Sequence, residues 1–129
     1  MLGSRRKALA GGLIAAIVLV TALAIATTGS AKGGQTLSLR ADAGGALKFN
    51  KKKLTAKPGK ATIVMTNPSS SGLKHAIEVE GHGFEKDGKT VGPGGKSRVT
   101  VKLKAGKYEF YCPVDGHKAA GMKGKLIVS

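Results

Sequence analysis

The sequence predicts an all-β fold, a sandwich or barrel of about seven to eight strands. Short runs in which apolar and polar residues alternate recur along the chain after residue 34, which is the period of a half-buried strand. Gly, Pro, Asn and Lys separate these runs, as turns between strands require. After the N-terminal segment no stretch repeats its apolar residues with a helical period.

The N-terminal segment is expected to lie outside that fold. Basic residues 5–7 precede an uncharged, mostly apolar run over residues 8–28, and small residues end the run, which is the pattern of a secretory signal. The run is also long enough to cross a bilayer as a helix, so an uncleaved membrane anchor through residues 8–28 is the alternative. We assign residues 1–31 to a signal peptide or anchor, and residues 32–129 to one domain that works outside the cytoplasmic membrane, in the periplasm, at the cell surface or secreted.

Three runs in the first half of the domain predict strands. Residues 35–41 place Leu37 and Leu39 on one face. Residues 46–56 alternate in the same way, and residues 60–67 form a nearly continuous apolar run, which is typical of a buried strand.

The middle of the domain combines strands with a long connection. Residues 73–81 alternate, with His75 on the inward side together with Ile77 and Val79. Residues 81–96 are rich in glycine and are expected to form a surface loop. Residues 96–103 alternate again and predict a strand.

The last two predicted strands enclose the segment of greatest chemical interest, "FYCPVDGHKAAGMKGKLIV". Residues 106–112 alternate so that Cys112 ends the first strand on its inward side, and residues 124–129 form the second. Cys112, His117 and Met122 follow one another at equal steps of five residues. One loop can therefore present a thiolate, an imidazole and a thioether to a single point, and the inward-facing His75 offers a second imidazole.

These four side chains predict a metal centre. Cys112 is the only cysteine of the chain, so the small domain has no internal disulfide, and a bound metal would both stabilise it and account for the unpaired thiol. Two imidazoles and one thiolate in a plane, with a weak axial thioether, form the blue-copper electron-transfer arrangement. His82 is flanked by glycines and is interpreted as an exposed loop residue, and Met65 as a core residue.

On these residues the chain resembles the cupredoxins, the small blue copper proteins, and especially the plastocyanin, azurin and pseudoazurin group. The resemblance covers residues 35–129: the quoted segment resembles the family's C-terminal copper loop, and residues 47–81 resemble its central strands leading to the first histidine. It implies a Greek-key β-sandwich that holds one type 1 copper ion. The implied ligands are His75, Cys112, His117 and Met122.

The resemblance also implies a route for the electron and shows one departure. In the family an electron leaves through the exposed edge of the histidine in the loop, here His117, and Val114 with Ala119 or Ala120 would take part in a surrounding apolar patch. Family members often have Asn after the first histidine, where it helps to hold the cysteine loop. This chain has Ala76 there, so the tuning of the copper by residues around its ligands is expected to differ.

The positive net charge restricts the classes of partner that the protein is expected to bind. Three of the 22 basic residues precede the apolar run, which leaves 19 against seven acids, a net charge of about +12 after the run. Export and the absence of basic clusters with interleaved aromatics exclude nucleic acid. An acidic redox partner, such as a cytochrome or a terminal oxidase, or an anionic membrane or wall surface is expected, and the protein should be a monomer.

The sequence therefore predicts a mononuclear copper protein that shuttles single electrons between Cu(II) and Cu(I). A module that delivers or buffers copper with the same ligands is the first alternative. A cupredoxin-like domain that holds no copper in the cell is the second. An enzyme is not expected, because four protein ligands leave no open position for a substrate.

Overall fold

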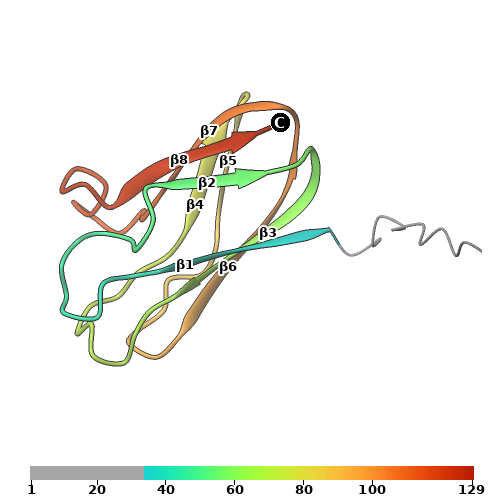
Figure 1. The fold of residues 1–129 in the computed structure, drawn as a ribbon. Helices are drawn as coiled ribbons and strands as arrows, with labels where there is room; N and C mark the ends of the chain where they lie inside the picture. Colours follow the sequence, from blue (N-terminus) through green and yellow to red (C-terminus); the bar gives the residue numbers. More distant parts are fainter. Residues whose placement is uncertain (1–33) are drawn as a thin grey trace, which may run out of the picture.

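A computed structural model describes residues 34–129, and these form two β-sheets packed face to face (Figure 1). The three-stranded sheet has the order β1-β3-β6 and the five-stranded sheet the order β2-β8-β7-β4-β5. The strands are β1 (Gln35–Arg40), β2 (Lys53–Ala56), β3 (Gly59–Thr66), β4 (Glu78–Gly81), β5 (Phe84–Asp87), β6 (Lys96–Leu103), β7 (Gly106–Tyr111) and β8 (Lys123–Val128). The predicted all-β sandwich of about seven to eight strands is confirmed.

The core lies between the sheets and follows the alternation that the sequence predicts. Ile63 and Met65 of β3 and Phe110 of β7 are completely buried, and their sequence neighbours point outward. The Phe110 ring packs against Phe49, with ring centroids 5.8 Å apart. Full burial of each such side chain stabilises the fold by about 1.5–3 kcal/mol.

The prediction of one continuous loop over residues 81–96 is wrong, because this segment contains β5. The strand pairs antiparallel with β4 through a two-residue turn, in which His82 and Gly83 have φ angles of 50° and 81°. Positive φ at both positions matches the hairpin turns that follow the twist of a sheet. Strand β5 lies at the sheet edge and its one large apolar residue, Phe84, is half-buried, so it lacks the alternation of the other strands.

Two predicted strands are shorter than expected. Residues 46–56 form a strand only from Lys53, and residues 73–81 only from Glu78. Before those points the chain passes from one sheet to the other, so ladders cannot continue, and single bridges remain at Phe49 and His75.

The sandwich has two distinct ends. The β7–β8 loop lies at one end, and β1 begins at the other, where β8 also finishes (Figure 1). At that second end Lys57 donates its backbone N–H to Gln35, and Ser129 donates to the carbonyl of Ala56. Within residues 34–129 we find no helix with the length and hydropathy needed to cross a membrane. The expected signal or anchor over residues 1–31 lies outside the described residues.

Candidate metal centre

Cys112 enters the centre from the end of β7. Alternation along the strand directs Tyr108, Phe110 and Cys112 into the core, and the Cys112 side chain is completely buried. The backbone N–H of Cys112 donates to the carbonyl of Met122 at 3.0 Å, which extends the pairing of β7 and β8 by one step. This bond closes the base of the loop that joins the two strands.

The loop over residues 113–121 is folded by its own backbone. His117 donates its N–H to the carbonyl of Val114, and Met122 donates to the carbonyl of His117, both at 3.0 Å. Gly116 turns the chain with a φ angle of 78°, a conformation that costs little only for glycine. Cys112, His117 and Met122 are therefore linked through consecutive backbone hydrogen bonds, and the buried Met122 is fixed beside the other two.

His75 reaches the centre from a different part of the chain. It exchanges two backbone hydrogen bonds with Val91, of 3.0 and 2.9 Å. The buried side chain of Asn67 supports this bridge, because its amide donates to the carbonyls of Val91 at 3.0 Å and Leu73 at 2.7 Å. Sequence reasoning missed this role of Asn67, since Asn before Pro is also the ordinary end of a strand.

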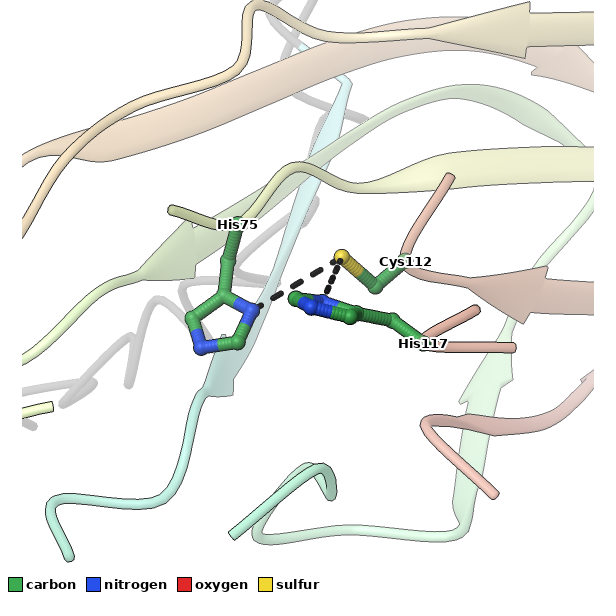
Figure 2. A group of neighbouring side chains, drawn as sticks. All are labelled: His75, Cys112 and His117. Atoms are coloured by element: carbon green, nitrogen blue, oxygen red, sulfur yellow. Dashed lines mark hydrogen bonds between the residues drawn. The ribbon is translucent and has the colours of Figure 1, made fainter. Parts of the chain in front are cut away.

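The structure brings three of the predicted ligands together (Figure 2). The Cys112 Sγ lies 3.8 Å from Nδ1 of His75 and 3.4 Å from Nδ1 of His117. One ligand atom from each of the three residues lies within 4.8 Å of the others. Bonds of about 2.0 Å to nitrogen and about 2.3 Å to sulfur, set at 120° on one ion, place the two atoms about 3.7 Å apart. The three side chains therefore fit a single ion in a trigonal arrangement.

Burial gives the centre its electrostatics. Loss of hydration lowers the pKa of His75, and the nearby His117 lowers it further, so His75 is held neutral as a metal ligand requires. Loss of hydration raises the pKa of the Cys112 thiol, and the backbone N–H groups of Ala76 and Val114 oppose that rise. A bound cation would supply the positive charge that stabilises a thiolate at this buried position.

Within the described part of the chain, the second ring nitrogen of His75 lacks the hydrogen bond that a metal-ligating histidine usually makes. Its Nε2 is buried and has no hydrogen-bond partner among residues 34–129. An unsatisfied buried polar atom costs about 1–3 kcal/mol. Metal-ligating histidines usually donate the N–H of their second ring nitrogen to a carboxylate, a carbonyl or a water. Among residues 34–129 no such acceptor lies next to Nε2 of His75. Coordination at Nδ1, which faces Cys112, would offset the cost.

Ala76 lacks the side-chain amide that is common at this position in the family, but its backbone contacts Cys112. Ala76 is completely buried, and its N–H donates to Cys112 Sγ at 3.5 Å. A backbone donor therefore reaches the sulfur although the side-chain amide common in the family is missing.

The residues expected to form an apolar patch belong to the same loop as His117, and all are at least partly exposed. His117 and Val114 are half-buried, and Ala119 and Ala120 are exposed. Among the described residues, Leu73 is the one large apolar residue that is exposed, and it lies two positions before His75. Of the three side chains that the structure brings together, His117 is the one that reaches solvent.

Lys118 links this loop to the neighbouring sheet. Its ammonium lies 3.4 Å from Glu80 and 3.0 Å from Glu109, and 3.6 Å from the centroid of the Tyr111 ring. The Tyr111 hydroxyl, which has a single hydrogen to donate, lies 2.8 Å from a carboxylate oxygen of Glu78 and 2.6 Å from one of Glu85. Glu78 is buried, whereas Glu80 is exposed.

Comparison with known proteins identifies the family. The family model named "Cupredoxin-like domain" matches residues 14–128 of the sequence, and no curated protein matches the chain. A dithionite-reduced auracyanin from Roseiflexus castenholzii is 25% identical, with a TM-score of 0.65, over 73% of this chain and 96% of that one. Auracyanin A from Chloroflexus aurantiacus, a "blue" copper protein, is 21% identical, with a TM-score of 0.62, over 74% of this chain and 100% of that one.

The same fold also occurs inside a larger enzyme. The copper nitrite reductase of Nitrosomonas europaea is 21% identical, with a TM-score of 0.59, over 74% of this chain but only 41% of that one. The extent of the family match shows that this protein belongs to the cupredoxin-like domain family, with one type 1 copper ion as its cofactor, and the structure brings His75, Cys112 and His117 together, with the buried Met122 in hydrogen-bonded backbone contact with the last two.

Proposed function

We propose that this protein is a one-electron carrier that works outside the cytoplasmic membrane and is not an enzyme. The observation that supports it most is the buried triad of His75, Cys112 and His117, whose ligand atoms already lie within 4.8 Å of one another. Copper, when bound, supplies a one-electron couple between Cu(II) and Cu(I). His75, Cys112 and His117 would hold the ion, and Met122 would be a weaker fourth ligand.

The chain's own contribution is a rigid, dry ligand set. Backbone hydrogen bonds fix Cys112, His117 and Met122 to one another, and the bridge to Val91 fixes His75. A ligand set held this way moves little when the charge of the centre changes, which favours fast electron exchange. Only His117 reaches solvent among the four, so it is the expected exit for the electron.

Cyclic voltammetry of residues 32–129 loaded with copper tests the carrier function. We expect a reversible one-electron wave that is stable over repeated cycles. A wave that decays as copper is lost on reduction would contradict the proposal and favour copper delivery.

Retention of Cu(I) separates the carrier from the delivery module. The complete burial of Cys112 and His75 favours slow release, since an acceptor protein cannot reach the sulfur directly. We expect a Cu(I) chelator to remove copper only slowly from the native domain. Transfer complete within the mixing time would establish the delivery module instead.

We further propose that the redox partner is acidic, and a cytochrome or terminal oxidase fits this requirement. Lys74 precedes His75, is exposed and forms no ion pair among residues 34–129, whereas Lys118 is occupied by two carboxylates. Substituting Lys74→Glu should lower the rate of electron exchange with an acidic cytochrome severalfold at low salt, with less effect at high salt. Rates that do not respond to salt would contradict this steering.

A further inference from the structure

The two outer faces of the sandwich differ in charge. The outward positions of the three-stranded sheet hold five basic residues and no acid; these are Arg40, Lys60, Lys96, Arg98 and Lys102. All five are exposed, and none forms an ion pair among the described residues. We call these five residues and the sheet surface between them the cationic face.

The opposite face is balanced. The outward positions of β4, β5 and β7 hold five of the chain's seven acids; these are Glu78, Glu80, Glu85, Asp87 and Glu109. Lysines lie on the same face along β7, β8 and β2, including Lys53, Lys107 and Lys125. The cationic face therefore carries five uncompensated positive charges, whereas on the opposite face lysines and acids balance one another.

The cationic face has the composition of a surface that meets a charged plane. Between its basic residues lie hydroxyl groups, and Thr62 and Thr100 hydrogen-bond to each other at 2.9 Å. Its one apolar outward residue, Val64, is half-buried. Protein interfaces are centred on aromatic and apolar side chains, which this face lacks. Anionic phospholipid needs only Lys and Arg within about one Debye length of the headgroups.

The position of the face supports a membrane. Strand β1, the edge of the cationic sheet, begins seven residues after the end of the apolar run at Thr28. Seven extended residues span at most about 24 Å, so a chain anchored through that run cannot move this sheet far from the bilayer. The β7–β8 loop lies at the far end of the sandwich from the start of β1 (Figure 1).

We propose that the cationic face docks on the anionic phospholipid surface of a membrane. Docking would hold the sheet against the headgroups while the end with His117 stays accessible to soluble partners. The proposal does not depend on electron transfer, because none of the five basic residues belongs to the metal centre.

Vesicle binding tests the proposal with matched variants. Residues 32–129 are suitable, since they contain both sheets and the whole described core. One variant replaces Lys60, Arg98 and Lys102 by Gln. The control replaces Lys53, Lys107 and Lys125 by Gln on the balanced face, which changes net charge equally.

Each basic residue at an anionic membrane contributes about a fivefold gain in affinity. We expect the cationic-face variant to bind vesicles of phosphatidylglycerol and phosphatidylcholine about 100-fold more weakly than the native domain, and the control less than fivefold more weakly. Vesicles of phosphatidylcholine alone should bind neither. Unchanged circular dichroism would show that both variants fold, and unchanged blue absorption of their copper forms would show that the metal centre is unaffected.

Three results would overturn the proposal. The first is equal weakening in both variants, which would mean that net charge acts without a defined face. The second is no binding of the native domain to anionic vesicles. The third is a loss of affinity for soluble polyglutamate without a loss for vesicles, which would assign the face to an acidic protein.

Discussion

The two histidines of the metal centre are fixed in different ways. His117 lies in a loop whose hydrogen bonds join residues only a few positions apart, from Val114 to Met122. His75 depends on Asn67 and Val91, which lie in separate segments of the chain. The loop is therefore a local structure, whereas the position of His75 is a product of the whole sandwich. The four predictions below test this difference, beginning with the largest expected effect.

Of the four substitutions, Asn67→Ala should lower the free energy of unfolding most, because Asn67 supports the segment that positions His75. The substitution removes the two hydrogen bonds that the buried Asn67 amide donates to the carbonyls of Leu73 and Val91, and it removes the acceptor of the Ser71 hydroxyl. Each lost hydrogen bond costs about 0.5–1.5 kcal/mol, so we expect a loss of about 2–4 kcal/mol in the free energy of unfolding, measured by urea denaturation of the metal-free domain. The exposed Asn50, which accepts one bond from Arg40, is the control and should cost under about 1 kcal/mol as Asn50→Ala. Equal losses would contradict a special role of Asn67.

Gly124→Ala tests the packing beneath the loop. A Cβ at this position would contact the Phe110 ring and lie 2.6 Å from the backbone oxygen of Lys52. Because backbone cannot move as a side-chain end can, we expect a loss of about 1–3 kcal/mol in the free energy of unfolding. A stability unchanged in urea denaturation would show that β8 shifts freely at its start.

Gly116→Ala tests the local turn by itself. An added Cβ would meet nothing within 4 Å, so its cost comes from the φ angle of 78°. We expect a loss of about 1 kcal/mol in unfolding free energy. Gly92→Ala is the matched control, because that site is also open and has no positive φ, and it should cost close to nothing. A similar cost at both sites would show that the turn does not depend on Gly116.

Lys118→Ala should have the smallest effect. Its ion pairs with Glu80 and Glu109 are partly exposed, so they add little stability, and the contact with Tyr111 adds a similar amount. We expect about 0.5–1 kcal/mol in thermal or urea unfolding at low salt, and less at high salt. A loss above about 2 kcal/mol would mean that the loop is not self-supporting.

The sequence was informative where structure is local. The alternation in residues 96–103 and 106–112 predicted β6 and the inward side of Cys112, because an alternating strand has few other solutions. The spacing of Cys112, His117 and Met122 indicated one centre for the same reason. These residues need only their own loop to come together.

Features that depend on distant partners were not predictable. The sequence of β5 shows little alternation of apolar and polar residues, and the strand forms because it pairs with β4 at the edge of the sheet. The support of His75 by Asn67 and Val91 depends on how the connections between the sheets meet. The charge difference between the two outer faces required the register of every strand, since the lysines are spread evenly along the sequence.

The central claim is that Cys112 binds copper together with His75 and His117. Absorption and electron paramagnetic resonance spectra of residues 32–129 loaded with Cu(II) test it most directly, with Cys112→Ser as the comparison. We predict an intense visible thiolate-to-copper band and a narrow copper hyperfine splitting, both lost in the variant. A pale protein with an ordinary tetragonal copper signal, the same in both forms, would contradict the claim.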